Sequence, residues 1–141
     1  MQTVSKLALI AAVNLMVNFS VMAGTPAPVS AEVYFISPAD GATVSGPVTV
    51  VFGLKNMGVA PAGTDVANTG HHHLLIDAAS PPDLDKPVPA DDHHKHFGAG
   101  QTETTITLPP GKHTLQLLLA DKLHVPHTPA VMSKKITITV K

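Results

Sequence analysis

The residues in this sequence that could do chemistry are its histidines, and most of them are grouped. The chain has nine histidines in 141 residues and no cysteine. Neutral imidazole is the commonest metal ligand in proteins, and its charge changes near neutral pH. Groups brought together by the fold could therefore form a metal site, a proton-sensitive site, or both. The three groups are His71, His72 and His73; His93, His94 and His96; and His124 and His127, with His113 apart.

The rest of the composition limits the ligands and the reactions. Because there is no cysteine, there are no thiolate ligands, thiol nucleophiles or disulfides. A metal would have to be bound by histidine, with help from Asp, Glu, Met or the backbone. The sequence contains no Ser-His-Asp arrangement, phosphate-binding loop or paired-carboxylate pattern. These observations favour a binding protein over an enzyme.

Charge argues against a nucleic-acid partner. Ten acidic residues face nine basic ones, all of which are lysine. Nucleic-acid binding needs a basic patch rich in arginine and lysine. We therefore expect no nucleic acid among the partners.

The N-terminus has the pattern of a secretory signal peptide. Lys6 precedes an apolar run that reaches Val21, and Ala23 is a small residue of the kind that signal peptidases favour. An uncleaved membrane anchor is the alternative, but Asn14 and Asn18 in the apolar run disfavour it. A lipoprotein is excluded, because the chain has no cysteine to carry the lipid. We expect a signal peptide over 1–23, a linker over 24–31 and one domain over 32–141. The location would be periplasmic or secreted, without stable membrane insertion after cleavage.

The domain has the pattern of short strands separated by turns. Thirteen prolines and ten glycines mark the turns, and no segment after residue 24 keeps a helical period. This predicts an all-β fold, an immunoglobulin-like antiparallel β-sandwich of about seven strands. The long segments 56–70 and 78–101 are predicted as functional loops. The predicted strands are 32–36, 47–54, 71–77, 102–108, 113–120 and 131–140.

Strand alternation divides the first histidine group between two faces. Successive side chains of a strand point to opposite sides, so His72 shares a face with Leu74 and Ile76. That face is the more apolar, and it predicts a buried His72 that is hydrogen-bonded to the backbone. His71 and His73 share the other face, about 6–7 Å apart, which is close enough to bind one ion.

The other groups lie in loops near strand ends. Gly98 and Gly100, after His96, indicate a tight bend. The loop with His124 and His127 joins the last two strands, beside the start of the 71–77 strand. His113 follows a Pro-Pro-Gly-Lys turn and takes the place where immunoglobulin-like folds often have a tyrosine bonded back to the turn. His93 is the weakest candidate.

We therefore predict a metal site where the three groups meet, with copper or zinc as the ion. Not more than four ligands would bind at once. Four acidic residues could assist. Met57 and Met132 could add thioether ligands for Cu(I), although packing is their favoured role. The candidate ligands are His71, His73, His94, His96, His124 and His127; the acidic residues are Asp77, Asp92, Glu103 and Asp121.

The order and spacing of several segments resemble the DUF4399 family, over about residues 32 to 141. This resemblance implies a small exported bacterial domain with no settled activity, and it carries no list of functional residues. The matching segments are 70–77, 96–103 and 108–117, and then Asp121 with 124–127.

Two other functions stay open at this point. One is a structural or adhesive sandwich that binds an envelope protein or glycan, with the histidines as a hydrogen-bonded rim. The other is a metal-dependent hydrolase, which needs three converging ligands and an adjacent Asp or Glu. For a metal-binding module, proton competition at the imidazoles predicts metal release in acid.

Overall fold

This computed structural model describes residues 23–141, so the predicted signal peptide lies outside the described residues except for Ala23. The described part contains no helix, and therefore none long and apolar enough to cross a membrane. Its strands are β1 (Glu32–Ser37), β2 (Thr43–Val44), β3 (Val48–Lys55), β4 (Gly58–Val59), β5 (Thr69–Ile76), β6 (His94–His96), β7 (Glu103–Ile106), β8 (Gly111–Ala120) and β9 (Ile136–Val140).

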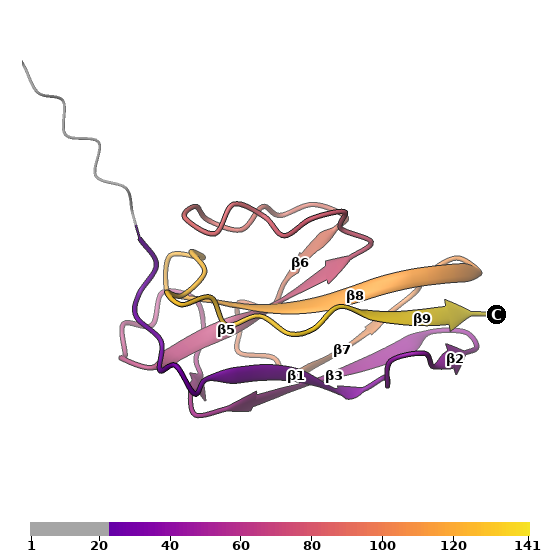
Figure 1. Ribbon diagram of the computed structural model, residues 1–141, viewed down its shortest axis with the longest axis horizontal. Coiled ribbons are helices and arrows are strands. Elements are labelled where there is room, and N and C mark those ends of the chain that lie inside the picture. The colour runs from indigo at the N-terminus through magenta and orange to yellow at the C-terminus, as the bar shows by residue number, and fades with distance from the viewer. Residues whose placement is uncertain (1–22) are drawn as a thin grey trace, which may run out of the picture.

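The strands form two sheets packed as a sandwich (Figure 1). One sheet has the order β1-β3-β7, and the other has the order β2-β9-β8-β5-β4, with β6 also paired to β5. Most neighbours are antiparallel, whereas β2 with β9 and β4 with β5 are parallel. The first sheet corresponds to strands A, B and E of an immunoglobulin-like domain, and β5, β8 and β9 correspond to C, F and G. The predicted fold class is confirmed.

The core lies between the sheets and follows strand alternation. On β3, Val48, Val50 and Phe52 are buried at alternate positions, as a half-buried strand requires. Leu74 and Ile76 of β5 belong to the same core cluster. β8 and β9 follow the same alternation on the side that faces this core, where Leu115, Leu117, Ile136 and Ile138 are buried.

A second, smaller core lies on the outer side of β5 and β8. The segment between β5 and β6 crosses this side (Figure 1), and its Val88 packs with Leu75, Leu118 and Ala120. The backbone N–H of Val88 donates to the carbonyl of His124 at 2.9 Å. The outer face of β5 is thus covered by a loop, which gives the face its own buried layer.

His113 closes the turn that leads into β8. Its Nε2 lies 2.8 Å from the carbonyl of Pro109, and its Nδ1 lies 2.7 Å from Oδ2 of Asp77. The hydrogen bond with Asp77 raises the pKa of His113, and the carbonyl of Pro109 acts in the same direction. The structural role predicted for His113 is confirmed.

The segment predicted as a linker, residues 24–31, lies against the loop that follows β8 (Figure 1). The N–H of Thr128 donates to the carbonyl of Thr25, and the N–H of Ala27 donates to the carbonyl of Thr128, both at 3.0 Å. Gly24 is buried and lies so close to Pro126 that a Cβ there would collide with the Pro126 carbonyl. This segment therefore meets the loop that carries the third histidine group.

Candidate metal centre

Four histidines from three separate segments meet beside the start of β5. His71 and His73 come from β5, His96 from β6, and His124 from the loop after β8. The His71 ring centroid lies 4.9 Å from that of His73 and 5.0 Å from those of His96 and His124. The rings of His96 and His124 lie 4.8 Å apart. The expected meeting of the three groups is confirmed, and these four residues are called the histidine cluster below.

The two β5 members form the floor of the cluster. As alternate residues of one strand, His71 and His73 point to the same side. They are 0% and 1% exposed, respectively. In the antiparallel register, His71 lies opposite Ala120 and His73 opposite Leu118, so small and apolar side chains of β8 adjoin them. These two imidazoles are therefore fixed in a nearly dry environment.

His96 reaches the cluster because β6 pairs with β5. His73 and His96 are direct partners in the antiparallel register, which places their side chains side by side. Gly98 provides the space, because a Cβ at this position would run into the His96 ring. His96 is exposed, so the cluster opens to solvent on this side.

His124 is presented by a tight loop with an unusual backbone. Its φ of 68° lies in the left-handed region, which few residues other than glycine adopt. Its N–H donates to the carbonyl of Asp121 at 2.9 Å. Asp121 is 4% exposed and its Oδ1 accepts the N–H groups of Leu123 and Val125 at 2.9 and 3.1 Å. The Asp121 carboxylate therefore organises the loop from inside.

The ring nitrogens of the cluster are suited to a metal ion. Within residues 23–141, Nδ1 and Nε2 of His71 and Nδ1 of His73 are buried without a hydrogen-bond partner. A buried polar atom without a partner is costly, so such atoms call for an explanation. One nitrogen from each of His71, His73 and His96 lies within 4.8 Å of the others. Nitrogens around one ion are about 3.3–4 Å apart at Zn–N bonds of ~2.0–2.1 Å, so small ring rotations suffice.

Electrostatics keeps these imidazoles in the metal-binding form. Burial, with the neighbouring imidazoles, lowers the pKa of His71 to about 4 and that of His73 to about 3. Burial and His124 lower the pKa of His96 as well. Because only neutral imidazole binds a metal, the cluster is ready for a cation at neutral pH.

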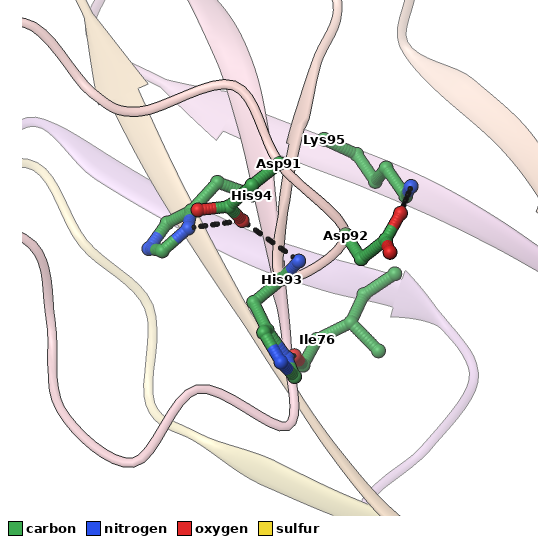
Figure 2. Close-up of polar contacts among 6 residues, drawn as sticks. All are labelled: Ile76, Asp91, Asp92, His93, His94 and Lys95. Atoms are coloured by element: carbon green, nitrogen blue, oxygen red, sulfur yellow. Dashed lines mark hydrogen bonds and ion pairs between the residues drawn. The ribbon is translucent and has the colours of Figure 1, made fainter.

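Two of the six candidate ligands do not join the cluster. Figure 2 shows the first, His94, whose Nδ1 lies 2.7 Å from Oδ1 of Asp91. The same oxygen accepts the N–H of His93 at 2.8 Å, and the His93 ring contacts the carbonyl of Ile76 at 2.7 Å. This contact network closes the turn into β6. His93 and His94 therefore have a structural role.

The second is His127, which is 2% exposed. Its Nε2 lies 3.1 Å from the carbonyl of Thr69, and its Nδ1 lies 3.4 Å from that of Leu119. Gly70 leaves room for this ring, since a Cβ there would lie 2.6 Å from Cε1 of His127. His127 therefore joins β5 and β8 to the following loop through backbone carbonyls.

His72 is buried as predicted, but its predicted hydrogen bonding is wrong. Its two ring nitrogens have no partner among residues 23–141. The ring instead packs at 5.0 Å from that of Phe52 in the main core. The reason is that the inner face of β5 meets apolar side chains of the opposite sheet, which offer no acceptor.

The acidic residues considered as helpers have separate partners. Asp77 binds His113, and Asp92 lies 3.6 Å from Lys95. Glu103 is on β7, in the other sheet. Asp121 alone among the four lies in a loop that carries a cluster histidine, and its carboxylate accepts backbone N–H groups of that loop. The closeness of Asp121 to His124 in the sequence was the one local sign that the two residues are connected. Its contacts with three backbone N–H groups can be seen only in the folded chain.

The class of protein is thus an immunoglobulin-like β-sandwich with a partly buried histidine cluster that could hold a metal ion. The chain belongs to the family described as a domain of unknown function, DUF4399, whose model matches residues 50–141. All four cluster histidines lie within the matched residues. No curated protein and no solved structure gives a significant match.

Proposed function

We propose that this protein is an exported binding module that holds one Cu(II) or Zn(II) ion with His71, His73, His96 and His124. The observation that carries the proposal is the set of buried, unpartnered ring nitrogens of His71 and His73, which converge with a nitrogen of His96. His124 is included because its ring centroid lies 4.8–6.3 Å from those of the other three. A bound cation satisfies these nitrogens, which nothing else in the described chain does.

The choice of ion follows from the ligand chemistry. Imidazole suits zinc and copper, whereas calcium and magnesium prefer oxygen ligands. Met57 and Met132, the methionines among residues 23–141, pack against the two cores, so neither is placed as a thioether ligand that would favour Cu(I). The ligand set therefore favours Zn(II) and Cu(II).

Binding is favoured over hydrolysis by the surroundings of the cluster. A hydrolytic metal site needs a carboxylate placed as a general base near the open position. The group of converging ligand atoms found in residues 23–141 consists of histidines alone. Asp121, the acidic residue nearest in sequence to His124, is occupied by backbone N–H groups.

The test is calorimetric titration of the purified protein with Zn(II) and with Cu(II). We expect one ion per chain, and a loss of about 100-fold or more in affinity for His71→Ala and His73→Ala. His113→Gln is the matched control, because it removes a buried imidazole at the opposite end of β8 from the cluster; its affinity should stay within about threefold. Binding no tighter than roughly millimolar in the parent protein would sink the proposal.

Export is part of the proposal and rests on the pattern of residues 1–23. N-terminal sequencing of the protein recovered from producing cells tests it. A mature chain that begins at Gly24 supports export with cleavage after Ala23. A chain that retains residues 1–23 contradicts it.

A further inference from the structure

We infer that Asp121 is a positioning residue of the metal site: its carboxylate holds the loop after β8 in the conformation that brings His124 to the other three ligands. This inference rests on the proposed function and adds to it a residue that does not touch the ion. The inference also explains why Asp121, an acidic residue in the loop after β8, is only 4% exposed.

The carboxylate acts as a hub for backbone donors. Oδ1 accepts the N–H groups on both sides of His124, from Leu123 at 2.9 Å and Val125 at 3.1 Å. Oδ2 accepts the N–H of Thr25 at 3.1 Å. The N–H of Asp121 itself donates to the carbonyl of Val125 at 2.9 Å, which closes the loop. Three charge-assisted bonds therefore fix a segment of five residues.

The loop needs such support because His124 is held in a left-handed conformation. Residues other than glycine adopt this region uncommonly, so the conformation persists only where surrounding contacts impose it. The bonds to Leu123 and Val125 bracket His124 and impose its φ of 68°. Without them the loop can relax, and the His124 ring leaves its place beside His71 and His96.

Other contacts tie the loop to its neighbours without shaping it. The N–H of Val88 reaches the carbonyl of His124, and the N–H of Gly63 reaches the carbonyl of Lys122 at 3.0 Å. Lys122 also pairs with Asp65 at 2.6 Å on the surface. These contacts locate the loop, whereas Asp121 sets the backbone path inside it.

The charge of Asp121 also favours a cation in the site. Asp121 is a buried acid in the loop that carries His124, 4% exposed. A carboxylate this near the ligands attracts a divalent ion by Coulomb attraction. The acid thus adds to metal affinity in two ways, with loop geometry as the larger one.

The main test is Asp121→Ala, titrated with Zn(II) and Cu(II). Alanine removes both carboxylate oxygens, and with them the bonds from Leu123, Val125 and Thr25 as well as the charge. We expect a loss of about 10- to 100-fold, the range typical of residues that orient metal ligands. Asp65→Asn is the matched control: it removes the same charge next to the same loop, and its affinity should change by less than about threefold.

A double-mutant cycle separates positioning from general stability. In the His124→Ala background there is no ligand left to position, so Asp121→Ala should cost no more than about threefold. The electron paramagnetic resonance spectrum of the Cu(II)-loaded Asp121→Ala protein should match that of His124→Ala, with one nitrogen fewer than in the parent. Additive losses, or a parent-like spectrum, overturn the inference.

Should Asp121→Ala fail to fold, Thr25→Pro decides instead, because it removes one donor to the carboxylate and leaves the loop sequence intact. We expect a loss of several-fold with the same spectral change, and unchanged affinity and spectrum overturn the inference. A parent protein that binds no metal contradicts the proposed function itself. A parent that binds tightly, with an Asp121→Ala variant that binds equally well, contradicts only the role of Asp121.

Discussion

At the scale of single residues, the neighbours of each histidine decide what it does. His113 has a carboxylate partner and a raised pKa, so it supports a turn. His127 contacts two backbone carbonyls and joins strands. His71 and His73 are buried with unpartnered nitrogens, so they are the members suited to a metal. The same side chain thus has three roles in one small domain, and burial combined with partners separates them.

His72→Leu should raise the free energy of unfolding by about 1–2 kcal/mol, because it removes two buried nitrogens that have no partner. Burial lowers the pKa of His72 to about 4. Between pH ~6.5 and ~4 the unfolded chain therefore binds the proton that the folded chain excludes, and stability falls as pH falls. The variant should show a smaller loss in this window. Urea unfolding at pH 7 and pH 5 measures both effects; a less stable variant at both values contradicts them.

His113→Gln should cost about 1–2 kcal/mol in mild acid and less in alkali. The pKa of His113 is raised by Asp77, so its contribution is complete below pH ~6.5 and is lost as pH rises through the raised value. Burial opposes ionisation of Asp77, but bonds from His113 and Thr114 outweigh it and lower its pKa, so its share is lost only in strong acid. Denaturant titrations from pH 4 to 9 check this; a difference that grows with pH would contradict it.

At the scale of elements, the period of β5 separates core from site. Alternate residues place His72, Leu74 and Ile76 inward and His71, His73 and Leu75 outward. The outward face becomes a site because β6 adds His96 beside His73 and the segment between these strands covers Leu75. A strand with two useful faces thus supports the sandwich and the cluster at once.

Gly98→Ala should weaken metal binding by about tenfold with little change in stability. The added Cβ collides with the far end of the His96 side chain, so the ring is forced to move while the backbone stays. Gly58→Ala is the matched control, because its Cβ meets Thr69 at an ordinary contact distance of 3.4 Å. Calorimetry with Zn(II) compares the two; equal affinities would show that the position of His96 does not matter.

At the scale of the whole molecule, the cluster joins parts of the chain that are distant in sequence. His71 and His124 are 53 positions apart, and the segment around Thr25 is joined to the same loop through Asp121. An ion bound by the cluster would link β5, β6 and the loop after β8. It would therefore stabilise the sandwich as a cross-link does.

Zn(II) at about 100 times its dissociation constant should add about 2.7 kcal/mol of stability and raise Tm by about 10 °C. A chelator should reverse the shift. His71→Ala should show none, whereas the Tm of His113→Gln should rise by as much as that of the parent. Differential scanning calorimetry makes the comparison. Equal melting of metal-free and metal-treated parent protein would support the adhesive alternative instead.

Metal affinity should fall less steeply with decreasing pH than the affinity of four imidazoles that have the usual pKa. Four ligands with a pKa of about 6.5 would lose roughly 10⁶-fold in affinity between pH 7 and 5. The pKa values of His71 and His73 are about 4 and 3, so these ligands stay neutral through that range. Titrations at pH 7, 6 and 5 should show a loss of less than about 10⁴-fold. A loss as large as for free imidazoles contradicts the dry floor of the cluster.

Much of the architecture follows from local pattern. The β-sandwich, the inward faces of the long strands and the turn role of His113 are all legible in alternation, turn residues and spacing. The grouping of histidines near strand ends also indicated where three segments meet. Local pattern could not show that His94 and His127 lie outside the cluster. Their positions depend on hydrogen-bonding partners that only folding brings near them: Asp91 for His94, and two strand carbonyls for His127.

The sequence by itself determined the strands, their faces and the candidate ligand type, since these depend on side-chain period and composition. The tertiary structure alone decided which imidazoles share one place, because that depends on strand register: His73 opposite His96, and His71 opposite the end of β8. It also decided that the floor is dry, because a loop with no strong pattern of its own covers the outer face. Strand register and the burial of the outer face of β5 arise from contacts between distant segments, and no local pattern encodes them.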